Sequence, residues 1–327
     1  MMNVQQAIAS FLQHGQSVRN LSDRTLRAYE SDLVQFKVHL SRDEMVSVTE
    51  TDLEEYISKL GTGSYRDTSI RRKVAALKVF FRYLEDHGIV SESPARRLKI
   101  KQPVEVRVPN VLSMKEIKSL LSAPKRQMKE LAVLQEQSAG ARNRYFCAVR
   151  DNVIIELLFS TGIRIGELVA LDVSDVDKPN RRLKITGRAT RGRYIDLTSD
   201  IVLNTLSDYM ALRGERGVEN TALFVGRSGT RLTIYSIENI FKKHVRSADI
   251  KRHVTPHALR HTMAAMMING GADIRDVQEI LGHASILSTQ VYTRFSPVKS
   301  RRTPSPMNQR DKITLDSSAR LVIRKKS

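Results

Sequence analysis

The sequence predicts two domains, the first all α-helical and the second mainly helical with a small antiparallel β-sheet. The chain of 327 residues is long enough to form two cores. Apolar residues recur at three- and four-residue spacings over most of its length, but a short region after Leu171 changes to a period of two. Residues 91–109 contain three prolines and no helical periodicity, so they indicate a linker between the two domains.

The first domain is predicted to contain helices only. In SDRTLRAYESDLVQFKVHL the apolar side chains share one face, and Ser22 or Asp23 can cap the start. TDLEEYISKL predicts a second, short helix. SIRRKVAALKVFFRYLEDHG predicts a longer one that Gly88 ends, because glycine readily adopts the left-handed conformation found after helices.

The second domain is predicted to begin with a helix in LSMKEIKSLLSAP, where Ser113 and Glu116 form a capping box. RDNVIIELLFSTG predicts a buried helix, and IRIGELVAL a second one after Gly162. The sheet is predicted from LDVSDVD, RRLKITG and RGRYIDLT. Further helices are predicted in IVLNTLSDYMALRG, SIENIFKKHVRSADI, HALRHTMAAMMING and IRDVQEILG, the last ending at Gly282.

The composition favours a polyanionic partner. The chain holds 54 Lys and Arg against 35 Asp and Glu, a formal net charge of +19, concentrated in the second half and the tail. Ribosomal and membrane-surface proteins share this property, so charge alone does not select nucleic acid. One cysteine, Cys147, excludes an internal disulfide and a cysteine-based zinc site. Without a membrane-length apolar run or a secretory signal, we expect a cytoplasmic, metal-free protein.

The residues that could perform chemistry lie in two segments. IRIGELVAL holds an arginine and a glutamate three residues apart on one helix face, Arg164 and Glu167. The segment from Thr255 to Thr293 adds His257, Arg260, His261, His283 and Tyr292. Each of them has an ordinary structural explanation when taken singly: an ion pair, a hydrogen bond at a helix end, or a core or surface tyrosine.

Together these residues match the cleavage of a phosphodiester without metal. This reaction needs a nucleophile, positive charge on the non-bridging oxygens and a proton for the leaving oxygen. Arg164 and Arg260 come from different helices, and each can hold two phosphate oxygens. His257 lies three residues before Arg260 and projects to the same side. His283 can donate a hydrogen bond, and Tyr292 can attack phosphorus.

The motifs resemble those of the tyrosine recombinases of the phage-integrase family, and the layout is similar to the Xer-type and transposon-borne members. TGIRIGELVALDVSDVD resembles the first arginine box, HALRH the His-x-x-Arg box, and LGHASILSTQVYT the final histidine and tyrosine box with its nine-residue step. The helical segments of the first domain resemble the core-binding, SAM-like domain. The resemblance covers residues from about 5 to 297 and implies the DNA breaking-rejoining fold for the second domain.

The resemblance also implies a role for each residue. Tyr292 would be the nucleophile, forming a 3′-phosphotyrosyl bond and releasing a 5′-hydroxyl. Arg164 and Arg260 would clamp the scissile phosphate, with His257 and His283 as hydrogen-bond donors or proton carriers. Two neighbours would support these arginines: Glu167 would orient Arg164, and His261 is next to Arg260 in the sequence. Because the covalent bond conserves the phosphodiester energy, no cofactor, ATP or metal is expected.

One turn departs from the family pattern. The family usually has Gly-Lys-Gly between the second and third strands, and its lysine is the general acid for the leaving oxygen. Here the matching residues are Gly187, Arg188 and Ala189. Arginine binds phosphate but is a poor proton donor, because its pKa exceeds about 12. Either Arg188 acts electrostatically, or Lys184 on the same strand face takes the role, or cleavage is slowed.

Two basic clusters are expected to contact DNA. Arg191 and Arg193 follow the turn and are expected to face the DNA backbone, although a solvated hairpin would look the same in sequence. Arg71, Arg72 and Lys73 begin their helix opposite its apolar stripe, and a DNA partner favours backbone contact for them over a solvated face.

We therefore expect a core-binding domain at 1–107 with a linker from about 91, a catalytic domain at 108–298 and a basic tail at 299–327. The expected activity is site-specific recombination of double-stranded DNA by four protomers through a Holliday junction, in the cytoplasm at the nucleoid. The tail is expected to reach a neighbouring protomer. Two alternatives remain: a DNA-binding accessory protein that has lost catalysis through Arg188, and supercoil relaxation like that of type IB topoisomerases. Participation of accessory proteins is left open.

Overall fold

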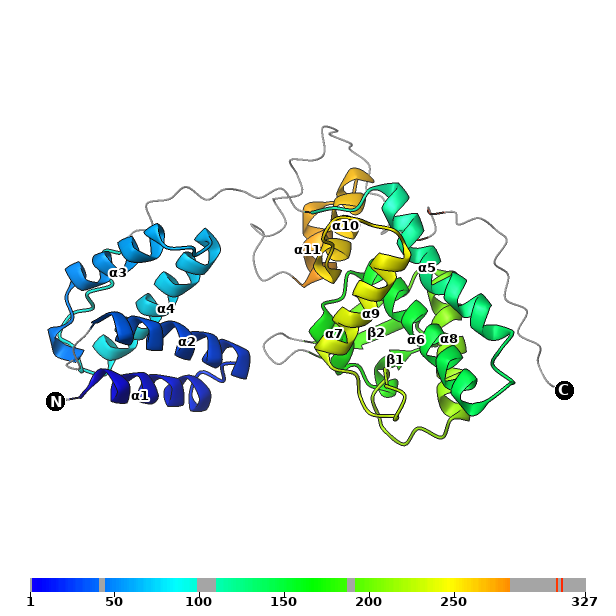
Figure 1. The fold of residues 1–327 in the computed structure, drawn as a ribbon, viewed down its shortest axis with the longest axis horizontal. Coiled ribbons are helices and arrows are strands. Elements are labelled where there is room, and N and C mark those ends of the chain that lie inside the picture. The colour runs from blue at the N-terminus through cyan, green and yellow to red at the C-terminus, as the bar shows by residue number, and fades with distance from the viewer. Residues whose placement is uncertain are drawn as a thin grey trace. The chain divides into compact units, whose positions relative to one another are not determined.

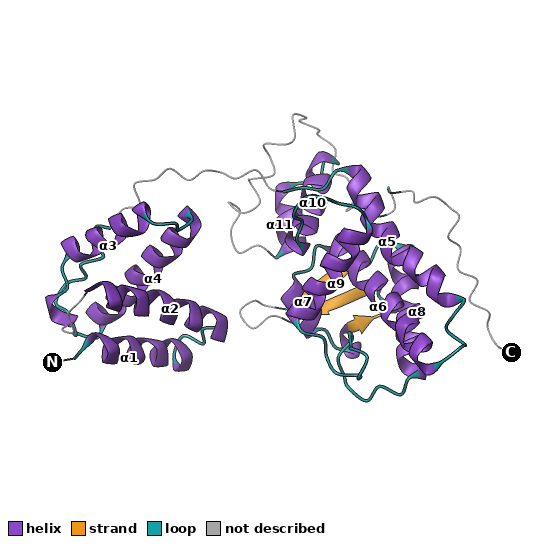
Figure 2. Cartoon of the chain, viewed as in Figure 1, coloured by secondary structure: helices purple, strands orange, loops and turns teal. Residues whose placement is uncertain are grey.

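The computed structural model describes residues 2–40, 45–98, 110–186, 192–282, 310 and 313. The chain divides into two compact units, Met1–Glu105 and Val106–Ser327 (Figure 1). The first unit is all-helical, and the second is mainly helical with a small sheet (Figure 2), which confirms the predicted fold class. Among the described helices, none is long and apolar enough to cross a membrane.

The described residues of the first unit form α1 (Val4–Ser17), α2 (Asp23–Leu40), α3 (Glu50–Thr62) and α4 (Asp67–Asp86), with a 3-10 turn at Met45–Ser47. Its core contains several aromatic rings among aliphatic side chains. Phe11 meets Phe80 edge to face with ring centroids 5.4 Å apart, and Phe36 meets Phe81 at 6.1 Å. These rings come from α1, α2 and α4, so the apolar faces predicted from periodicity meet in one core.

Lys73 does not lie on the exposed face of α4, so that expectation was wrong. Its side chain is buried, with 2% relative exposure, and its Nζ donates to Asp32 Oδ1 at 2.8 Å and Gln35 Oε1 at 2.6 Å. Arg72 pairs with the same aspartate from a half-exposed position and donates to the carbonyl of Ala28. The carboxylate on α2 compensates the buried ammonium. Lys73 therefore joins two helices and is not placed to contact DNA.

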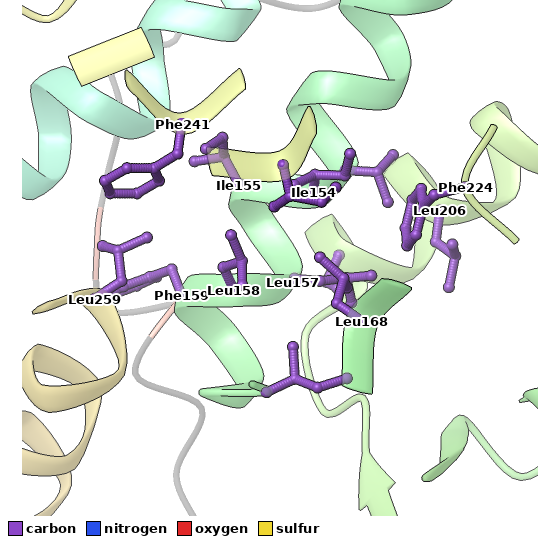
Figure 3. Packing of buried hydrophobic residues seen from close by; sticks show 14 of the residues in the cluster. Ile154, Ile155, Leu157, Leu158, Phe159, Leu168, Leu206, Phe224, Phe241 and Leu259 are labelled. Atoms are coloured by element: carbon purple, nitrogen blue, oxygen red, sulfur yellow. The ribbon is translucent and has the colours of Figure 1, made fainter. Parts of the chain in front are cut away.

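The second unit is built around one buried helix, α6 (Ala139–Thr161), in which every side chain from 148 to 159 is buried. Packed against α6 are α5 (Met114–Ala132), α8 (Asp200–Glu215) and α10 (Pro256–Asn269). Figure 3 shows Ile154, Leu158 and Phe159 of α6 among the apolar side chains of this core. The Ser113 capping box begins α5 as predicted, but the helix continues through the buried Pro124, because packing on α6 offsets the hydrogen bond that proline removes.

The remaining elements of this unit are short. They are α7 (Ile165–Ala170), a 3-10 turn at Val173–Asp175, β1 (Val176–Asp177), β2 (Arg182–Ile185), β3 (Arg193–Asp196), α9 (Ile234–Ser247) and α11 (Ile274–Leu281). The strands form an antiparallel sheet in the order β1-β2-β3, with Lys184 opposite Tyr194. Leu183, Ile185 and Ile195 are buried, so Lys184 lies on the exposed face.

Two described residues of the tail dock on this same unit. Arg310 is buried, with 1% relative exposure, and holds Glu156 of α6 through Nε at 2.6 Å and Nη2 at 2.9 Å. Lys125 of α5 approaches the same carboxylate at 2.9 Å, and Ile313 joins the apolar core. Burial alone would raise the pKa of Glu156, but the hydrogen bond from Arg310 and the two positive charges hold it below its ordinary value.

We expect Arg310→Ala to lower the free energy of unfolding of the second unit by about 3 to 5 kcal/mol, because it leaves a buried carboxylate short of a partner. Urea denaturation measures this loss. Lys251→Ala is the control, since Lys251 and Asp249 form an exposed pair whose removal costs at most about 1 kcal/mol.

The loss should depend on pH. A carboxyl group whose pKa is depressed in the folded state contributes stability at neutral pH and loses it as the pH falls through the folded pKa. The difference between wild type and Arg310→Ala should therefore shrink in acid. A loss equal to that of Lys251→Ala at neutral pH would contradict a buried ion pair at Arg310.

Candidate active site

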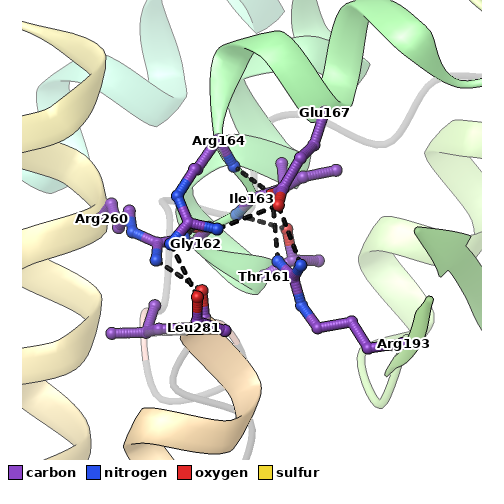
Figure 4. Close-up of polar contacts among 9 residues, drawn as sticks. Thr161, Gly162, Ile163, Arg164, Glu167, Arg193, Arg260 and Leu281 are labelled. Carbon is purple, nitrogen blue, oxygen red and sulfur yellow. Dashed lines mark hydrogen bonds and ion pairs between the residues drawn. The ribbon is translucent and has the colours of Figure 1, made fainter. Parts of the chain in front are cut away.

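The candidate site lies where α6 and α11 end close to the starts of α7 and β3 (Figure 4). Both helices end at a glycine in the left-handed conformation, Gly162 with φ +59° and Gly282 with φ +61°. A side chain at Gly162 would be crowded as well as strained: its Cβ would lie 2.9 Å from both Leu281 Cδ2 and Met263 Cε, and these two side chains would have to shift. The last carbonyls of the two helices are thus left open to side-chain donors.

Arg164 uses these carbonyls and begins α7. Its Nη2 donates to the carbonyl of Gly282 at 2.7 Å, and its Nη1 donates to Glu167 Oε1 at 3.0 Å. Glu167 Oε2 also accepts from the backbone N–H of Arg164 at 3.0 Å. The guanidinium is therefore fixed at two points, and 36% of the side chain is still exposed.

Arg260 of α10 is held in a similar way but is buried, with 5% relative exposure. Its Nη1 donates to the carbonyl of Gly162, and its Nη2 donates to that of Leu281 at 2.5 Å. The C-terminal ends of helices carry partial negative charge, so they stabilise the cation. Arg164 and Arg260 thus donate to the carbonyls of two consecutive residues at the end of α11, Gly282 and Leu281 (Figure 4).

Glu167 also pairs with Arg193, a residue that the sequence predicted to face the DNA backbone. Arg193 donates from Nη1 to Oε1 at 2.8 Å and from Nη2 to Oε2 at 3.0 Å. Burial alone would raise the pKa of Glu167, but these hydrogen bonds, the backbone N–H of Arg164 and both positive charges lower it. Only 16% of the Arg193 side chain is exposed, which favours support of Glu167 over contact with DNA. The alternation of side chains along a strand could have indicated this role, because Arg193 is on the same face of β3 as the buried Ile195.

The two histidines of α10 differ in exposure. His257 lies exposed in the first turn, whereas His261 is half-buried one residue after Arg260. Burial lowers the pKa of His261, and the charges of His257 and Arg260 lower it further. His261 therefore stays neutral at pH 7, which suits a supporting residue beside a cation.

Other predicted site residues lie outside the described part of the chain. They are Arg188, Arg191, His283 and Tyr292. The last continuous described segment ends at Gly282, directly before His283. The alternative proton donor, Lys184, is described and exposed near the end of β2.

Comparison with known proteins identifies the class. This chain belongs to the phage integrase family of tyrosine site-specific recombinases, which act on DNA: the Phage integrase family model matches residues 110–298, and the model of the Phage integrase N-terminal SAM-like domain matches residues 8–88. Each matched range lies within one of the two compact units of the structure.

Relatives of similar length share the whole layout. The chain is 34% identical over 303 residues to a tyrosine recombinase of Agathobacter rectalis, covering 92% of this chain and 95% of that protein. It is 34% identical over 301 residues to the tyrosine recombinase XerC of Pelobacter propionicus, covering 90% and 93%. The crystal structure of the XerH site-specific recombinase bound to palindromic difH substrate has the same fold, with a TM-score of 0.69, 22% identity, and coverage of 89% and 82%.

We expect Gly162→Ala to destabilise the second unit by about 2 to 4 kcal/mol, because it adds left-handed strain to a steric clash. Urea denaturation measures the loss. Gly217→Ala is the matched control: its φ is +61° but a Cβ meets nothing within 4 Å, so only the strain of about 1 to 2 kcal/mol remains. Equal losses for the two variants would show that the close approach of α10 and α11 to Gly162 is not required.

Proposed function

We propose that this recombinase cleaves DNA through Tyr292 while Arg164 and Arg260 hold the scissile phosphate. The observation that supports this most is the fixed pair of guanidinium groups on the carbonyls of Gly162, Leu281 and Gly282. Two arginines whose positions are set before DNA arrives can stabilise the transition-state charge without reorganising.

In the proposed step, the Tyr292 oxygen attacks phosphorus and forms the phosphotyrosyl bond. The bond from phosphorus to the 5′-oxygen breaks, and that oxygen takes a proton and leaves as a hydroxyl. His257 and His283 contribute hydrogen bonds or carry protons. A 5′-hydroxyl from a second strand reverses the chemistry and joins the strands, so the cycle needs no ATP.

The proton for the leaving oxygen comes from a group still to be assigned. Arg188 replaces the usual lysine, and its charge would stabilise the leaving oxygen although it transfers a proton poorly. Lys184 is exposed on β2, opposite Tyr194 of β3, so it is the alternative donor. The replacement of lysine by Arg188 is also compatible with the second candidate function, an accessory protein that binds DNA without cleaving it.

The proposed substrate is double-stranded DNA carrying a specific recombination site, in line with the difH complex of XerH. We propose further that four protomers exchange strands in pairs through a Holliday junction, in the cytoplasm at the nucleoid. The tail was expected to contact a neighbouring protomer, whereas Arg310 and Ile313 occupy their own protomer's core here. Any exchange of the tail between protomers must first break the Arg310 and Glu156 pair.

A nicked DNA substrate, which traps the covalent intermediate because the cleaved fragment diffuses away, tests the proposed chemistry. Wild type should form an adduct that resists denaturing electrophoresis, and Tyr292→Phe should form none. Arg164→Ala should lower the rate by about 10²- to 10³-fold, as expected when one transition-state donor is removed. DNA that wild type binds but never joins covalently would favour the accessory protein.

Arg188→Lys tests the departure from the family pattern. Lysine has a pKa near 10.4 and can release its proton, so the variant should form the covalent adduct about 10-fold faster or more. If Lys184 is the donor, the variant Lys184→Ala should form the covalent adduct much more slowly than the wild type. An unchanged rate in Arg188→Lys together with a large loss in Lys184→Ala would assign the proton to Lys184.

A further inference from the structure

Glu167 is shared between two guanidinium groups, and this arrangement has an electrostatic consequence. It accepts from the backbone and Nη1 of Arg164 and from both terminal nitrogens of Arg193. With one carboxylate between two cations, the cluster keeps a net positive charge. If Arg193 were absent, Glu167 and Arg164 would form a neutral pair, and less charge would be left for a phosphate.

We propose that Arg193 is a positioning residue for DNA cleavage: it takes up the charge of Glu167 and thereby sets the position and the available charge of Arg164. The inference rests on the proposed function of Arg164 as a phosphate clamp. It assigns Arg193 to the chemistry of cleavage and not to the DNA-binding surface.

Packing at the end of α11 supports this assignment. A Cβ on Gly282 would lie 3.0 Å from Cζ and Nη1 of Arg193, so the guanidinium lies directly against the backbone of that glycine. The carbonyl of Gly282 accepts the second hydrogen bond of Arg164. Arg193 therefore contacts both groups that fix Arg164, the carboxylate of Glu167 and the backbone at Gly282.

The position of Arg193 in the sheet adds a mechanical link. Arg193 begins β3 and pairs with Ile185 at the end of β2, so it lies at the last described pair of the two strands. Its guanidinium reaches from this strand to α7, which Arg164 begins. The ion pair thus fixes the β2–β3 hairpin relative to the arginine clamp, and a misplacement of about 1 Å can cost about 10² in rate.

The test compares Arg193→Ala and Arg193→Lys with a control on the same sheet, Arg182→Ala. Arg182 pairs with Asp177 at 2.8 Å, and within the described part of the chain it forms no hydrogen bond or ion pair with Arg164, Glu167 or Arg193. Covalent trapping at saturating DNA gives the cleavage rate, and titration gives the affinity. Arg193→Ala should cleave about 10- to 100-fold more slowly, with affinity changed less than about 3-fold. Arg193→Lys should recover part of the rate, and Arg182→Ala should match wild type.

Two further readouts distinguish positioning from a general structural role. Because Arg193 lowers the pKa of Glu167, the acid limb of the cleavage rate should move to higher pH in Arg193→Ala. In a Glu167→Gln background, the same Arg193→Ala change should cost less than about 3-fold, since both residues act through one interaction.

The outcomes separate the two proposals. If wild type forms no adduct, the proposed function fails. If wild type forms one and Arg193→Ala cleaves at the same rate, or loses only affinity, the positioning role of Arg193 is wrong. If Arg193→Ala does not fold, Arg193→Lys decides: a slower rate with a shifted acid limb supports the inference, and a rate and pH profile equal to those of wild type overturn it.

Discussion

The active-site region depends on hydrogen bonds from arginine side chains to the carbonyls at two helix ends. Gly162 and Gly282 end α6 and α11 in the left-handed conformation, and the nearby carbonyls accept from Arg260 and Arg164. At α11 the backbone N–H of Gly282 takes up carbonyls one turn back, and the carbonyls of Leu281 and Gly282 are left for the two arginines. The positions of both cations therefore depend on where α6 and α11 end, which in turn is set by packing within the domain.

The core handles charge in a consistent way. In both units, each buried carboxylate among the described residues lies beside two or more basic side chains. Glu156 binds Arg310 and Lys125, Asp32 binds Lys73 and Arg72, and Asp151 binds Arg150, Lys243 and His244. Burial opposes ionisation of Asp151, yet the hydrogen bond from His244 and the neighbouring charges lower its pKa to about 2. A strongly basic chain has cations available for this purpose, and Glu167 shows the same arrangement next to the clamp.

Local patterns predicted much of the fold and the site. Apolar periodicity located α2, α3 and α4, a continuous apolar run located the second half of α6, a change of period located the three strands, and glycines located the ends of α4, α6 and α11. The Arg164 and Glu167 pair followed from their spacing within one helix turn. All of these depend on neighbours within a few residues, where sequence spacing and spatial distance are tightly related.

The sequence by itself predicted most of the helices, the family motifs and the candidate nucleophile and clamp. Only the tertiary structure decided the partners of the remaining charges. Lys73 meets Asp32 across 41 residues, Arg193 meets Glu167 across 26, and Arg310 meets Glu156 across 154. A basic residue at a surface and one in a buried ion pair look alike in sequence, because its environment is set by side chains from another element. For Arg193 this difference separates a DNA contact from a support of the clamp.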